Sequence, residues 1–168
     1  MSLSMYEASV PVFQRALGNL DALLRQGEEH AAAAGLDLSE LAAASLAPDM
    51  LPLTGQIQRA SDSAKFAAAH LTGTSGPSFP DTETSFEELH QRIAATLAYL
   101  ASVDPADLEG SETRAIVQKS QRGERHFVGS SYLLTFALPN FFFHVTTAYG
   151  ILRHKGVPVG KADYLGAF

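Results

Sequence analysis

The side chains best placed for chemistry lie near the end of the chain, where Asn140 and His144 interrupt a long apolar run. They are four residues apart, so on a helix both side chains lie on one face, a single turn from each other. Pro139 has no N–H group, which leaves the carbonyl of Thr135 without its helical partner and free to bind another group. An imidazole, an amide and an unpaired carbonyl within one turn predict either a small polar site or a satisfied structural network.

Three roles fit His144: a metal ligand, a general base, or a core histidine bonded to a neighbour. A buried neutral imidazole needs one donor and one acceptor, and Asn140 or Thr147 could serve as partners. The remaining histidines show neither H-x-x-x-H nor H-E-x-x-H spacing, and we expect most of them to be solvated: His30, His70, His90, His126 and His154.

Hydrophobic periodicity predicts four helices that position this site. The first covers residues 9–34, the second runs from an N-cap at Asp49 to about residue 71, and the third follows a capping box at Ser85 and Glu88 and ends near residue 102. The fourth covers residues 130–156 and is close to apolar on every side, so it should be buried all round.

A short β-hairpin is expected between the third and fourth helices, because β-branched or aromatic runs at residues 114–118 and 125–128 flank a glycine turn that begins at Gln121. The hydrophobic tail after residue 156 should lie back over the helices. The sequence therefore predicts an all-α protein, a four-helix bundle with one hairpin, in a single domain of residues 1–168.

The overall composition excludes several classes of function. The 168 residues carry 18 acidic and 12 basic side chains, a net charge of −6, and no basic run, which argues against a nucleic-acid partner. Cysteine is absent, which excludes disulfides, thiolate metal ligands and a thiol nucleophile, and the reduced cytoplasm is the expected location. The apolar run at residues 136–144 ends too early to span a membrane, and no signal peptide is expected. No phosphate-binding loop is present, so no nucleotide cofactor is expected.

Two further patterns have competing interpretations. Asp81 and Glu83 precede the third helix, and their favoured interpretation is favourable charge at its positive end; the alternative is a lid that brings an acid to the bundle mouth. The dense aromatic set favours core packing or a homodimer interface over an aromatic ligand cage: Tyr132, Phe136, Phe141, Phe142, Phe143 and Tyr149. Because one core would not cover so apolar a fourth helix, we predict a homodimer through the bundle helices.

Four segments resemble one bacterial family of uncharacterised function: MYEASVPVFQRALGNL, LAPDMLPLTGQIQRASD, PSFPDTETSFEELHQRIAATLAYL and ALPNFFFHVTTAYGILRHKGVPVGK. They cover most of the chain in the family's order. That family is similar to the DinB/YfiT-like group of four-helix bundles, to which metal-dependent enzyme activity is ascribed. The resemblance implies a site where three histidines hold a divalent metal, one on the second helix and an H-x-x-x-H pair on the fourth.

This chain departs from that pattern. If His144 takes the place of the second histidine of the pair, Asn140 takes the place of the first. The second helix offers Gln56, Gln58 and Asp62 where the third histidine should be. Neutral amides bind transition metals poorly, so we expect a degraded metal site with no metal and no cofactor.

The expected function is therefore that of an uncharacterised DinB-like bundle with a small-molecule binding or structural role. The expected pocket consists of His144, Asn140, Gln56, Arg59 and Asp62 and would take an unknown small molecule. The alternative is a metal-dependent hydrolase or thiol-transferase that uses His144, so the sequence leaves open whether the chain is an enzyme. A third, weaker interpretation is an adaptor for a partner protein in a stress response.

Overall fold

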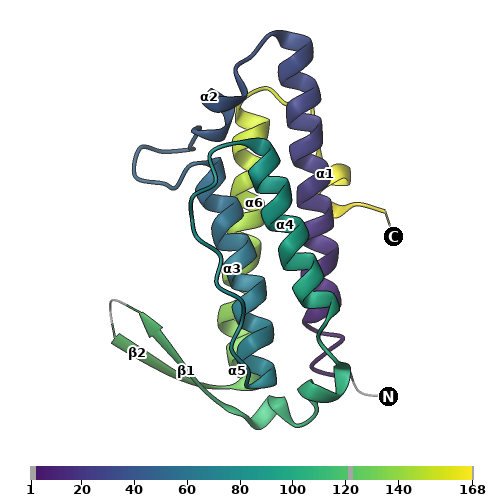
Figure 1. Ribbon diagram of the computed structural model, residues 1–168, viewed down its shortest axis with the longest axis vertical. Coiled ribbons are helices and arrows are strands. Elements are labelled where there is room, and N and C mark those ends of the chain that lie inside the picture. The colour runs from purple at the N-terminus through teal and green to yellow at the C-terminus, as the bar shows by residue number, and fades with distance from the viewer. Residues whose placement is uncertain (1–2, 121–122, 168) are drawn as a thin grey trace.

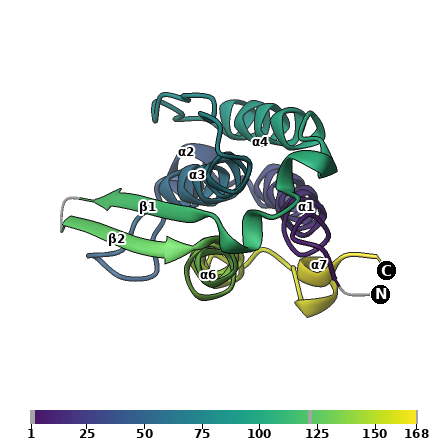
Figure 2. The ribbon, with the colours of Figure 1, turned by 90° about the horizontal axis from the view of Figure 1, so that it is seen from below.

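The bundle consists of α1 (Val10–Ala34), α3 (Leu53–Thr72), α4 (Phe86–Ala101) and α6 (Leu138–His154) in the computed structural model, which describes residues 3–120 and 123–167 (Figure 1). α3 packs against α4 and α6, and α1 packs against the same two helices, so the four helices surround one core (Figure 2). α1 and α6 run in one direction and α3 and α4 in the other. Residues 73–85, here called the return segment, must therefore travel back along α3 before α4 begins (Figure 1).

The core follows the apolar stripes expected from the sequence. Phe13, Leu17, Leu20 and Leu24 recur at steps of three and four along α1, and all are fully buried. The buried face of α3 is mostly small: Ala60, Ala64, Ala67 and Ala68. Small side chains let the neighbouring helices approach α3 closely. Large side chains of α1 and α6 fill much of the rest of the core. The rings of Phe13 and Phe141 meet edge to face, with centroids 4.9 Å apart.

The starts of α4 and α3 differ in how well the sequence predicts them. The capping box of α4 is confirmed: the Glu88 N–H donates to Ser85 Oγ at 3.3 Å, and the Ser85 N–H donates to the Glu88 carboxylate at 3.0 Å. The N-cap expected at Asp49 is wrong, because Pro52 occupies that position and α3 begins at Leu53. The physical reason is that a residue preceding proline is pushed out of the helical region, so the helix cannot start before Pro52.

The predicted hairpin is present between α4 and α6 and projects sideways from the bundle (Figure 1). β1 (Ala115–Ser120) pairs antiparallel with β2 (Gly123–Val128), with Ala115 opposite Val128. The expected turn residues Gln121 and Arg122 lie outside the described residues. Two 3₁₀ turns, η1 (Pro105–Leu108) and η2 (Ser111–Thr113), lead from α4 into the hairpin.

The fourth helical segment is continuous but not uniform. α5 (Gly129–Tyr132) passes through a π turn, η3 (Leu133–Ala137), into α6, so Pro139 falls in the first turn of α6 where its missing N–H is tolerated. The expectation that this segment is buried on every side is wrong. Leu134 is 62% exposed and Phe143 is 55% exposed, because α1 and α3 cover only one side of the helix.

The tail packs on the bundle, as the sequence predicts. α7 (Lys161–Leu165) lies against α1, where the Asn19 amide donates to the carbonyls of Tyr164 at 3.1 Å and Leu165 at 2.9 Å. The short α2 (Leu38–Ala42) follows α1 at the upper end of the bundle in Figure 1. None of the helices in the described residues combines the length and apolar character needed to cross a membrane.

Candidate functional site: a cavity between α3, the hairpin and α6

His144 is partly buried on α6 and bonds across the bundle to α3. Its Nδ1 lies 2.8 Å from Oε1 of Gln56, a fully buried amide whose Nε2 donates to the Leu51 carbonyl at 3.0 Å. Because an amide oxygen only accepts, this contact assigns the proton to Nδ1. Burial, with a smaller contribution from the charge of Arg59, lowers the pKa of His144 to about 4, so the ring is neutral at pH 7.

Asn140 belongs to a separate network although it lies one turn from His144. Its Nδ2 donates to Oγ of Ser63 at 2.7 Å, and that hydroxyl donates to the Arg59 carbonyl at 2.6 Å. Ser63 is not among the residues predicted for the pocket. The available signal was its spacing, since Ser63 is seven residues after Gln56 and therefore lies two turns along the same face of α3.

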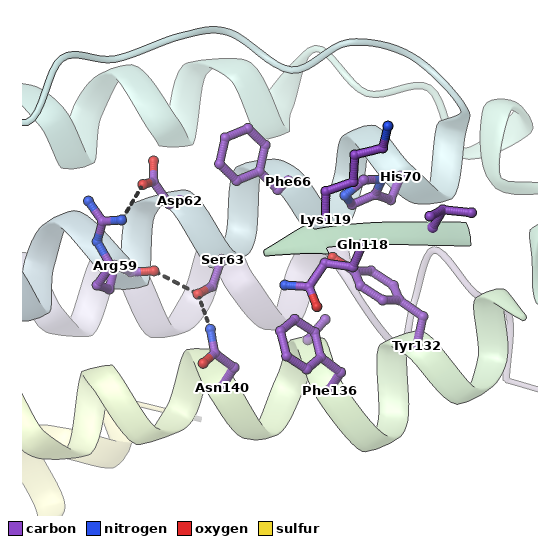
Figure 3. A pocket seen from close by; sticks show the side chains of 12 residues that line it. Arg59, Asp62, Ser63, Phe66, His70, Gln118, Lys119, Tyr132, Phe136 and Asn140 are labelled. Carbon is purple, nitrogen blue, oxygen red and sulfur yellow. Dashed lines mark hydrogen bonds and ion pairs between the residues drawn. The ribbon is translucent and has the colours of Figure 1, made fainter. Parts of the chain in front are cut away.

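A cavity of about 590 Å³ opens beside Asn140, between α3, β1 and the α5–α6 segment (Figure 3). One group of lining residues is apolar or aromatic: Phe66, His70, Val117, Tyr132, Phe136 and Ala137. The other group is polar: Arg59, Asp62, Ser63, Gln118, Lys119 and Asn140. The volume lies within the range of roughly 300–1,000 Å³ found for small-molecule sites, and the mixture of walls resembles theirs.

The five residues that the sequence predicts for a pocket fall into two groups. Arg59, Asp62 and Asn140 line the cavity, whereas His144 and Gln56 do not and instead bond to each other. The aromatic wall was missed as a ligand surface because Tyr132 and Phe136 were assigned to core packing or a dimer interface. The hairpin side chains were missed because the position of β1 against α3 depends on long-range packing.

Two other histidines are not solvated as expected. His70 lines the cavity, its ring lies edge-on to Tyr132 with centroids 5.3 Å apart, and burial lowers its pKa. His90 on α4 lies between two carboxylates of α1, with Nδ1 facing Asp21 and Nε2 3.0 Å from Glu28. Both rings lie on helix faces that pack against neighbouring elements. An isolated histidine in the sequence gives no signal of such packing.

A buried ion network borders the polar end of the cavity. Oδ1 of Asp62 lies 2.8 Å from Nζ of Lys65 and 2.9 Å from the guanidinium of Arg92, and the side chains of both cations are 1% exposed. Lys65 Nζ also lies 4.5 Å from the ring centres of Phe66 and Phe79. Asp62 is therefore the carboxylate that makes two buried cations tolerable.

The return segment supplies the other two acids of this network. Asp81 pairs with Arg59 and lies 3.0 Å from Arg92, while Glu83 lies 2.9 Å from Arg92 and accepts from Gln58 at 2.9 Å. Both carboxylates thus bond to guanidinium groups of α3 and α4, while Ser85 serves as the N-cap of α4. Their attachment holds the return segment against the bundle beside the cavity.

The residues at Asn140 and His144 do not fit a three-histidine metal site. His144 is the only imidazole there, and because its Nδ1 bonds to Gln56 it offers a single ligand atom, Nε2. The facing groups are the amide of Gln56 and the hydroxyl of Ser63, which are weak ligands for transition metals. Within residues 3–120 and 123–167, no three His, Asp or Glu side chains are grouped so that they could hold a metal ion.

Comparison with known proteins identifies the family. Residues 5–165 match the family described as Domain of unknown function (DUF1993). The chain belongs to the DUF1993 family. The crystal structure of a DinB family member protein from Shewanella denitrificans is 42% identical to it, with a TM-score of 0.93 over 98% of this chain and 93% of that chain. The expected DinB-like bundle is thus confirmed for this DUF1993 protein. The search of curated proteins gave no match.

Proposed function

We propose that this DUF1993 protein binds a small molecule in the cavity between α3, β1 and the α5–α6 segment. The observation that carries the proposal is the cavity itself, about 590 Å³ with an aromatic wall and a limited set of polar groups, of which Arg59, Asp62, Ser63 and Asn140 lie at one end. Binding sites combine these features because apolar surface supplies affinity and a small number of polar groups fixes orientation.

The state of Gln118 supports this proposal. Its side-chain oxygen is buried and has no hydrogen-bond partner among the described residues, although the residue lines the cavity (Figure 3). A buried amide oxygen without a partner costs free energy that a bound molecule with an N–H or O–H group would recover. The net charge of −6 and the absence of cysteine support a cytoplasmic protein without a nucleic-acid partner.

The alternative function is a metal-dependent hydrolase or thiol-transferase that uses His144. One observation favours it: the imidazole of His144 is neutral at pH 7, and neutral imidazole is the form that binds metals. We expect purified protein to hold far less than one equivalent of zinc, nickel or manganese, because the surrounding groups are amides and hydroxyls. Stoichiometric metal that disappears in His144→Ala would favour the alternative.

The cavity is tested with an NMR titration of ¹⁵N-labelled protein against uncharged one-ring and two-ring fragments. Val117→Trp should block the cavity from β1, and Val128→Trp is the matched control on β2, because Val117 and Val128 are 40% and 47% exposed and only Val117 lines the cavity. We expect fragments to shift amides around Phe66 and Phe136 in the wild type and in the control. Shifts that persist in Val117→Trp, or that lie elsewhere in the wild type, would contradict the proposal.

A further inference from the structure

The polar end of the cavity contains one charged group that is fixed. Arg59 and Asp62 lie together at this end, away from His70 and Tyr132 (Figure 3). Asp62 holds the buried cations Lys65 and Arg92, and a ligand that drew it away would leave both without this carboxylate. Asp62 is therefore part of the scaffold.

Arg59 differs from Asp62 because its partner can be exchanged. Its guanidinium lies 3.5 Å from Oδ2 of Asp62 and closer to Asp81 on the return segment. The side chains of Arg59 and Asp81 are 38% and 42% exposed, so solutes reach the pair, and exposed ion pairs contribute little to stability. A carboxylate that enters the cavity can therefore compete with Asp81 for the planar, two-pronged guanidinium group.

Such an exchange leaves no buried charge without a partner. Asp81 also lies 3.0 Å from the guanidinium of Arg92, and it can keep that contact when it releases Arg59. Arg92 in turn retains Asp62 at 2.9 Å and Glu83 at 2.9 Å. The network can thus give up the contact between Arg59 and Asp81 while its buried part stays intact.

The other end of the cavity has the shape and chemistry for a ring. Tyr132 and Phe136 lie with ring centroids 5.8 Å apart and planes inclined by 30°, and Phe66 contributes a third aromatic side chain to the lining. Aromatic walls of this kind favour a flat, apolar ligand group through stacked or edge-to-face contacts. Lys119, the other cation of the lining, is 3.5 Å from Glu124 and its side chain projects into solvent.

We infer that the cavity takes a ring-bearing carboxylate, whose carboxylate group replaces Asp81 on Arg59 and whose ring lies among Phe66, Tyr132 and Phe136. An N–H or O–H group on the ring would donate to the unpartnered oxygen of Gln118. This inference rests on the proposed function, because it names the ligand class of the same cavity. It also gives Asp81 a role as an internal competitor of the ligand.

The test compares each of three acids with its own amide: indole-3-acetate, 4-hydroxyphenylacetate and 2-naphthylacetate. Dissociation constants come from NMR titration, and for the indole pair also from ligand fluorescence, since the chain has no tryptophan. We expect at least one acid to bind the wild type about fivefold or more tightly than its amide, as one added charge-assisted contact would provide. Arg59→Gln should remove this preference, because it weakens the binding of the acid more than the binding of its amide.

Asp81→Asn should change acid binding in the opposite direction to Arg59→Gln. Removing the competing carboxylate should strengthen acid binding by about two- to tenfold without affecting the amides. Glu87→Gln is the matched control, because it removes one negative charge from an exposed position on α4 that is not among the cavity residues. Arg59→Lys keeps the charge but loses the two-pronged geometry, so it should retain part of the preference.

The outcomes separate the two proposals. Equal binding of acids and amides at the cavity would overturn the carboxylate inference and leave the proposed function intact. A preference for acids that survives Arg59→Gln, or that Asp81→Asn does not increase, would also overturn the inference. If the uncharged fragments shift the backbone amide signals around the cavity but no acid or ligand amide does, the inferred ligand class is wrong. If neither set of compounds shifts these signals, the proposed function fails too.

Discussion

Nδ1 of His144 lies 2.8 Å from the side-chain oxygen of Gln56, and this bond links α6 to α3 across the bundle. The bond requires a proton on Nδ1 and the side-chain oxygen of Gln56 as the acceptor, and the neutral ring present at pH 7 carries its single proton there. The pair is therefore an interhelical contact, and it lies outside the residues that line the cavity. Its protonation state gives the first prediction.

Unfolding free energy should depend on the protonation of His144. The pKa of His144 is lowered from 6.5 to about 4 by burial and by Arg59, so the unfolded chain binds a proton that the folded chain excludes between these values. The stabilisation is complete above about pH 6.5 and is lost as the pH falls towards 4. We expect its loss to amount to about 1–2 kcal/mol, because solvent screens part of the cost at a partly buried ring.

Urea unfolding at pH 7 and pH 4.5 measures this effect. His144→Gln should reduce the difference between the two pH values, whereas the exposed control His126→Gln should leave it unchanged. An unaltered pH dependence in His144→Gln would show that protonation of His144 does not cause the fall in unfolding free energy at low pH.

Asp62→Asn should destabilise the bundle strongly. The amide would leave Lys65 and Arg92 buried without the carboxylate that faces both, a loss of about 3–5 kcal/mol. Glu124→Gln is the control, because its pair with Lys119 is exposed and should contribute less than about 1 kcal/mol. Denaturant midpoints of the two variants measure the difference, and similar midpoints would contradict the assignment of Asp62 to the scaffold.

Two glycine substitutions should have opposite effects. A Cβ at Gly129 would lie 1.8 Å from the Ser111 carbonyl oxygen, so Gly129→Ala must displace backbone where β2 enters α5, at a cost above about 2 kcal/mol. Gly18→Ala meets no atom within 4 Å on the exposed face of α1 and should gain about 0.5–1 kcal/mol. Thermal unfolding measures both changes, and a neutral Gly129→Ala would contradict the close approach.

The part of η3 and α6 that α1 and α3 leave uncovered is the surface that we propose for a two-fold homodimer. Leu134 in η3 and Phe143 in α6 remain exposed, and large apolar side chains left exposed are a common feature of subunit interfaces. Light scattering at micromolar concentration should give the mass of a dimer, and Phe143→Glu should give that of a monomer. A monomeric mass for the wild type would contradict the proposal.

The parts of the fold that depend on local chemistry could be predicted from the sequence. The capping box at Ser85 and the stripe of α1 need only neighbouring residues, and the hairpin needs only two short runs and a glycine. The start of α3 was misplaced because the preference of Asp49 for an N-cap was weighed without the restriction that Pro52 places on the residue before it.

The site was harder to predict because it depends on contacts between distant segments. The spacing of Asn140 and His144 predicted that they share a helix face. It could not predict that Asn140 bonds to Ser63 and His144 to Gln56. Lys65 and Arg92 carried a usable signal, since each occupies a position on the buried stripe of its helix. A charged residue in such a position indicates buried partners, and these partners are Asp62 and the acids of the return segment.

The crystal structure of the protein with its tightest-binding fragment tests the proposed cavity most directly. We predict fragment density between Phe66 and Phe136, a hydrogen bond to Gln118, and an unchanged contact between His144 and Gln56. For an acidic fragment, the carboxylate should lie on Arg59 in place of Asp81. A fragment bound elsewhere, or a metal held by Nε2 of His144, would contradict the proposal.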